Sequence, residues 1–127
     1  RYPQALKTCR QAAELAPNRP EPYVEMLRLA ERAKDLDEQA WAAVGVLTTA
    51  WGPRQSAWRD QAADAITRVR AAWKAAETWM RLMELEAAVA QAERVDLRVR
   101  LEWSGAGDLD LEVLEPRDGV CHRDQPY

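Results

Sequence analysis

Acidic side chains near the C-terminus are the residues whose type and spacing come closest to a metal site. Asp108 and Asp110 alternate along a predicted strand, which places both carboxylates on one face, and Asp118 or Asp124 follows them. Calcium binds several such oxygen ligands. The segment lacks the ligand spacing of a calcium-binding loop, and a solvated strand face accounts for the same aspartates. We therefore expect no metal ion, and we name Asp108, Asp110 and Asp118 as the candidates if one binds.

The two cysteines and the histidine are not arranged as catalysis or zinc binding would require. Cys121 and His122 are neighbours on a predicted strand, so they point to opposite faces, and a structural zinc needs four ligands. Cys9 lies on an apolar helix face, where a thiol is typically a small buried hydrophobe. A disulfide between Cys9 and Cys121 requires a fold that brings the two ends together. We expect no enzyme activity, no cofactor and no small-molecule ligand.

Charge and hydropathy exclude two further classes of partner. The chain carries 18 basic and 21 acidic residues, for a net charge of -3, so it has no positive field that would attract nucleic acid. No segment approaches the roughly 18 uncharged apolar residues of a membrane span. The chain begins within a predicted helix and ends just after a predicted strand, so we expect a soluble fragment of a longer protein.

The elements that position these residues begin with three predicted helices. The first covers residues 3–16, the second opens at about Pro20, and Asp37 rather than Asp35 is the predicted N-cap of the third. Their apolar residues recur at spacings of three and four, the period of a helix face. The three predicted faces are Ala5, Cys9, Ala12 and Leu15; Tyr23, Met26, Leu27 and Ala30; and Ala40, Trp41, Val44, Leu47 and Ala50.

An internal repeat relates these helices at an offset of about 35 residues, within the range of helical solenoids. Residues 5–17, A-x3-C-x2-A-x4-P, resemble the second helix and closing proline of a tetratricopeptide repeat. The resemblance covers about residues 3–66, but Lys34 and Asp35 stand where the family has a Gly, with one extra residue in that turn. It implies stacked antiparallel hairpins that bind protein. The positions that resemble the next repeat are Tyr23, Leu27 and Ala30.

Residues 56–94 contain no Gly or Pro, and their apolar stripe predicts one long helix. The alternative is two antiparallel helices with a polar break near Lys74 to Thr78. The first half of the stripe closes the helical array. The second half has no predicted cover within the chain and should therefore meet a protein partner, a second copy, or the missing part of the β domain. The predicted partner-binding residues are Trp73, Trp79, Met80 and Met83.

From residue 95 onwards the apolar period changes from helical to two, which predicts strands. Residues 97–103 and 109–113 alternate in polarity around the turn segment SGAGD, so we expect a β-hairpin. Placing Leu101 opposite Leu109 also places Arg100 opposite Asp110, which favours this register.

Residues 96–121 contain an aspartate-rich D-x-D-L-x-V strand pattern that runs into a proline and a glycine turn. With this pattern they resemble the opening of an uncharacterised bacterial family, the YfaP-type domain. Glu112 stands where that family more often has His, and the last two thirds of such a domain are not in this sequence. The resemblance implies the start of a β-sandwich-like domain without an assigned activity, in a bacterial protein of the cytoplasm or periplasm. The matching residues are Asp108, Asp110, Leu111, Val113, Pro116, Gly119 and Cys121.

The sequence therefore predicts a mainly α chain with two parts, a helical repeat region at 1–94 and an incomplete β domain at 95–127. The function we expect is a noncatalytic scaffold for protein–protein interaction. The alternative is a cell-envelope or extracellular β module that binds carbohydrate or calcium, with the helices as a spacer.

Overall fold

The computed structural model describes residues 2–94, 104–107, 112–114 and 120–122. The chain forms two compact units, Arg1–Asp96 and Leu97–Tyr127, and each is described by itself. The first unit is all-helical. Its five helices are α1 (Tyr2–Leu15), α2 (Glu21–Ala33), α3 (Leu36–Thr49), α4 (Ser56–Ala75) and α5 (Trp79–Ala92).

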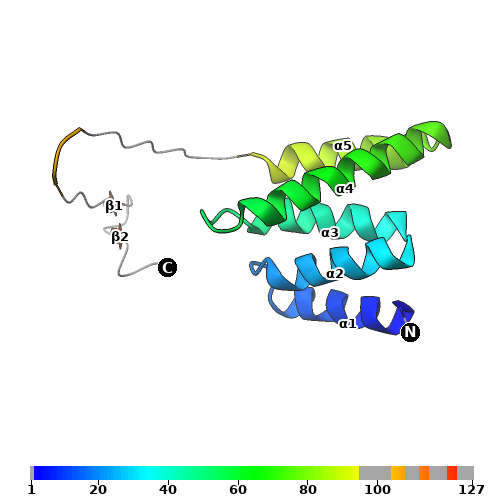
Figure 1. The fold of residues 1–127 in the computed structure, drawn as a ribbon, viewed down its shortest axis with the longest axis horizontal. Coiled ribbons are helices and arrows are strands. Elements are labelled where there is room, and N and C mark those ends of the chain that lie inside the picture. Colours follow the sequence, from blue (N-terminus) through cyan, green and yellow to red (C-terminus); the bar gives the residue numbers. More distant parts are fainter. Residues whose placement is uncertain (1, 95–103, 108–111, 115–119, 123–127) are drawn as a thin grey trace. The chain divides into compact units, whose positions relative to one another are not determined.

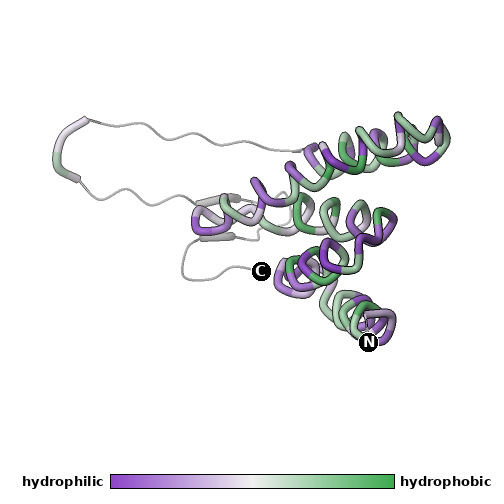
Figure 2. The backbone as a smooth tube through the Cα atoms, turned by 45° about the vertical axis from the view of Figure 1, so that its right-hand side comes forward, coloured by the Kyte–Doolittle hydropathy of each residue, from purple (hydrophilic) through white to green (hydrophobic). Residues whose placement is uncertain are grey.

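The five helices pack against their neighbours in an antiparallel stack (Figure 1). Helix α3 lies at the centre and contacts α2, α4 and α5. Figure 2 shows hydrophobic and hydrophilic residues alternating along the helices, as expected where one face of a helix is buried. Mainly α architecture and antiparallel helix packing were both predicted, and both are confirmed.

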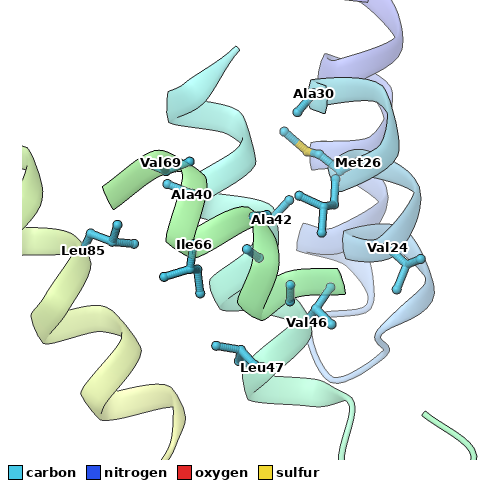
Figure 3. Packing of buried hydrophobic residues seen from close by; sticks show 14 of the residues in the cluster. Val24, Met26, Ala30, Ala40, Ala42, Val46, Leu47, Ile66, Val69 and Leu85 are labelled. Atoms are coloured by element: carbon cyan, nitrogen blue, oxygen red, sulfur yellow. The ribbon is translucent and has the colours of Figure 1, made fainter. Parts of the chain in front are cut away.

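Small residues allow these helices to approach closely. The largest fully buried side chains are Met26, Leu27, Val46 and Val69. Leu85 of α5 points toward the helix that carries Ile66 and Val69 (Figure 3). Alanines fill the space between the larger residues, because a methyl group lets two helix backbones pack near each other. The completely buried alanines are Ala30, Ala42, Ala43, Ala50, Ala62 and Ala65.

The predicted face of the second helix is correct, that of the third is correct only in part because Ala42, Ala43 and Val46 are also fully buried, and that of the first is wrong. Helix α1 buries Leu6 and Ala13, whereas Leu15 is 87% exposed. Two stripes of helical spacing lie one residue apart in this segment. The stripe that contains Leu6 is buried because a leucine removes more apolar area from water than Ala5 does.

The N-cap of α3 is Asp35 and not Asp37. The Asp35 carboxylate accepts a hydrogen bond of 3.1 Å from the backbone N–H of Glu38. This position satisfies one of the unpaired N–H groups of the first turn, which is the role of an N-cap. Asp37 is the second residue of α3, and its side chain is free to interact with another element.

The prediction of one helix over residues 56–94 is wrong, and the alternative of two antiparallel helices is confirmed. The chain turns between α4 and α5 at Glu77, whose φ of 56° is left-handed. The N–H of Glu77 donates to the carbonyl of Lys74 (3.2 Å), and the N–H of Thr78 donates to that of Trp73 (3.0 Å). This pair of bonds is a Schellman motif, which closes a helix end.

The same motif joins α2 to α3. Lys34 has a φ of 57°. Its N–H donates to the Glu31 carbonyl (3.2 Å), and the Asp35 N–H donates to the Ala30 carbonyl (3.0 Å). Both short turns of the stack therefore use one backbone geometry, and in both a residue with a side chain occupies the position that normally favours glycine.

Replacing either left-handed residue with glycine is expected to stabilise the helical unit. Lys34→Gly and Glu77→Gly should each raise the free energy of unfolding by about 1 kcal/mol, because a side chain disfavours this conformation. Urea unfolding followed by circular dichroism measures the change. Lys74→Gly, within α4, is the control and should destabilise by up to about 1 kcal/mol. If both turn variants are destabilised like the control, the left-handed turns are wrong.

In the second unit, β1 (Glu112–Leu114) and β2 (Val120–His122) pair antiparallel, with Val113 opposite Cys121. The predicted pairing of residues 97–103 with 109–113 falls largely outside the described residues. No β-sandwich is found in the described part of this unit.

Candidate functional site

A groove of about 570 Å³ runs between α3 and α5. The α3 wall begins at its first turn and continues to Thr48, and the α5 wall extends from Arg81 to Ala88. Tyr23 of α2 and Trp73 of α4 complete the lining, so four helices contribute to the groove. The groove residues are Tyr23, Asp37, Ala40, Trp41, Val44, Gly45, Thr48, Trp73, Arg81, Glu84, Leu85 and Ala88.

Aromatic rings form part of the groove wall. The rings of Tyr23 and Trp41 lie with centroids 5.2 Å apart and planes inclined at 45°. The Arg10 guanidinium stacks 4.1 Å from the centroid of a Trp41 ring and also pairs with Glu38 at 2.5 Å. These contacts hold Trp41 in a fixed orientation from both α1 and α2. Gly45 leaves the space that the Tyr23 ring occupies.

A salt bridge between Arg81 of α5 and Asp37 of α3 spans the groove. Nη1 of Arg81 donates to both carboxylate oxygens of Asp37, at 3.0 and 3.1 Å. Both side chains are more than half exposed, so the pair adds little stability. The pair places one positive and one negative side chain at fixed positions beside the apolar wall of the groove. Glu84 adds a second carboxylate on the α5 side.

The predicted partner-binding residues divide between two places. Trp73 is only 7% exposed and packs in the core, with part of its side chain lining the groove. Trp79, Met80 and Met83 are 51%, 78% and 71% exposed. They lie on α5 but do not line the groove, whose α5 residues are on another face of the helix. Their role in binding stays a prediction.

The other candidate residues do not form a reactive site in the described part of the chain. Cys9 is a half-buried free thiol, and burial, with a smaller contribution from the Glu25 charge, raises its pKa. A raised pKa lowers the fraction of reactive thiolate at neutral pH. Within residues 2–94 and the shorter described ranges, no three metal-ligating side chains cluster. The calcium candidates Asp108, Asp110 and Asp118 lie outside the described residues.

Sequence reasoning missed the groove, although one signal for it exists. Gly45 is the only glycine in the helix of residues 36–49, and an isolated glycine within a helical pattern often has a packing reason. In this fold the reason is the Tyr23 ring. The Arg81–Asp37 pair has no such local signal, because the two residues are far apart in the sequence.

None of the described helices is both long and apolar enough to cross a lipid bilayer. Comparisons with protein-family models, curated proteins and solved structures found no match to this chain.

Proposed function

We propose that the helical unit is a noncatalytic scaffold that binds protein, a short array of the tetratricopeptide type. The alternation of long and short connections between antiparallel helices, and the shared geometry of the two short turns, support this interpretation. In such arrays binding needs only a rigid stack and exposed side chains of suitable shape.

The groove between α3 and α5 carries the proposal. It is lined mainly by apolar and aromatic side chains, and aromatic residues are enriched at protein-binding hot spots. Its size suits one or two side chains of a partner segment rather than a whole domain. The expected ligand is a peptide segment with a large apolar or aromatic anchor, and a basic residue near the anchor would meet Glu84.

A matched pair of threonines tests this proposal. Thr48 lines the groove and Thr67 lies on α4. Both are exposed, and both donate a hydroxyl hydrogen bond to the carbonyl four residues earlier, at 2.8 and 3.0 Å. Thr48→Arg fills the groove with a long charged side chain, whereas Thr67→Arg makes the same chemical change elsewhere. Both variants should fold as the wild type does.

Peptides selected from a displayed random library against the wild-type chain supply the probes. We expect the selected peptides to share a large apolar anchor. By isothermal titration, Thr48→Arg should weaken their binding at least about tenfold, and Thr67→Arg should leave it unchanged. Peptides that bind both variants equally well, or a library that yields no binder, would count against the groove as the binding site.

A further inference from the structure

The outward face of α5 is apolar along its whole length. Trp79, Met80 and Met83 are more than half exposed, and the alanines that follow them on the same face are exposed as well. At about 100° per residue these side chains fall within one third of the helix circumference. We call them the α5 stripe: Trp79, Met80, Met83, Ala87 and Ala90.

The opposite end of the stack differs from the α5 stripe. The outward face of α1 is mostly polar, with exposed Gln4, Lys7, Thr8 and Gln11. Head-to-tail stacking of two chains would therefore press an apolar surface on a polar one. Contact between two α5 stripes would bury apolar area on both sides.

The α5 stripe is complementary to itself in one orientation. Met80, Met83, Ala87 and Ala90 are spaced by three, four and three residues, the a and d positions of a coiled coil. An antiparallel pair of α5 helices related by a two-fold axis at Leu85 would place Met80 opposite Ala90 and Met83 opposite Ala87. Both methionines then face an alanine, which lets this part of the two helices interdigitate, whereas Trp79 lies opposite Gln91 at the end of the contact.

Of the two carboxylates that flank the stripe near the two-fold axis, Glu84 and Glu86, one is paired within its own chain. Glu86 flanks the stripe, but its carboxylate accepts hydrogen bonds from Arg70 of α4, at 2.5 and 3.2 Å. This hydrogen bond also raises the pKa of Arg70, so the guanidinium stays charged. The acidic edge near the two-fold axis is therefore partly neutralised within each chain.

We propose that the chain forms a two-fold symmetric dimer through the α5 stripe, with antiparallel α5 helices and Met80 and Met83 packed on Ala90 and Ala87 of a second copy. The partner of this surface is thus another molecule of the same protein. The groove between α3 and α5 lies on a different face of α5 and stays open in such a dimer.

The mass of the particle in solution is the first test. Size-exclusion chromatography with light scattering, over a range of concentrations, should give twice the mass of one chain. Ala87→Glu places a carboxylate against Met83 of the second copy and should raise the dissociation constant about tenfold to a hundredfold. Ala63→Glu, an exposed alanine on α4, is the matched control and should leave it unchanged.

The orientation is tested by disulfide trapping in a Cys9→Ala, Cys121→Ala background that is first shown to fold and dimerise. A mixture of Met80→Cys and Ala90→Cys chains should form a disulfide between the two variants. Each variant alone should not, because ten residues of helix separate equivalent positions by about 15 Å.

Three results would overturn the proposal. A wild type that is strictly monomeric would show that the stripe does not bind a second copy. This holds whether the methionines of the monomer are exposed or are covered by the rest of the chain. A dimer that Ala87→Glu and Ala63→Glu affect equally would use another surface. Efficient trapping of Met80→Cys with itself would mean a parallel arrangement.

Discussion

Replacing Trp73 with alanine is expected to lower the free energy of unfolding by about 3–5 kcal/mol. The side chain is 7% exposed in the last turns of α4, and it belongs to the same apolar cluster as Ile66, Val69 and Leu85. Its removal leaves a cavity between α4 and α5 that the surrounding helices can fill only in part. The backbone carbonyl of Trp73 also accepts hydrogen bonds from the Thr78 N–H and hydroxyl, so a shift here disturbs the turn.

Trp79→Ala is the control for this prediction. It removes the same ring from a position that is 51% exposed, six residues later in the chain, and in the monomer should cost less than about 1 kcal/mol. Urea unfolding followed by circular dichroism at 222 nm measures both variants without relying on tryptophan fluorescence. Equal losses for the two variants would contradict the assignment of Trp73 to the core and Trp79 to the surface.

Local sequence signals predicted most of the first three helices. These signals are the proline near residue 20, an aspartate before the third helix and the Gly–Pro pair after it. Each starts or stops a helix within a few residues of its own position. The choice between Asp35 and Asp37 as the cap was wrong by two positions. Both residues are aspartates and would cap equally well. Only the Schellman motif at Lys34 decides where the third helix can begin.

The division of residues 56–94 could not be derived from local signals in the same way. The chain turns at Glu77, a residue type that rarely takes a left-handed conformation, and no Gly or Pro marks the position. Helix α4 has 20 residues and α2 has 13. The seven extra residues are close to two full turns, which keeps the same face buried while delaying the break. The apolar stripe therefore continued without interruption past the point where a repeat predicts a turn.

The two surfaces of α5 differ in how far the sequence predicts them. The exposure expected at Trp79, Met80 and Met83 is found, because uncovered apolar residues at the end of an array can be seen in the sequence. The groove depends on contacts between residues 44 positions apart, such as Asp37 and Arg81, and on the orientation of Trp41. Such contacts follow from the packing of whole helices, so no single segment predicts them.

Gly45→Ala is expected to destabilise the helical unit by about 1–3 kcal/mol, although alanine is the better helix former. A Cβ atom at residue 45 would lie 2.1 Å from Cδ1 of Tyr23, far inside van der Waals contact. The Tyr23 ring would have to leave its place beside Trp41, and α2 and α3 would separate. Gly52→Ala is the control, since its Cβ would meet only the flexible end of Gln55, at 3.1 Å.

The sign of the Gly45→Ala effect should reverse when Tyr23 is absent. In a Tyr23→Ala background the three atoms nearest to the added methyl group are absent, and the higher helix propensity of alanine should stabilise the unit by up to about 1 kcal/mol. The four chains of this double-mutant cycle, unfolded in urea, give the coupling between the two positions directly. A Gly45→Ala change that is equally harmful with and without Tyr23 would mean that another contact requires the glycine. A reversal of sign would show that this glycine is present to seat the Tyr23 ring, and hence to shape the wall of the groove.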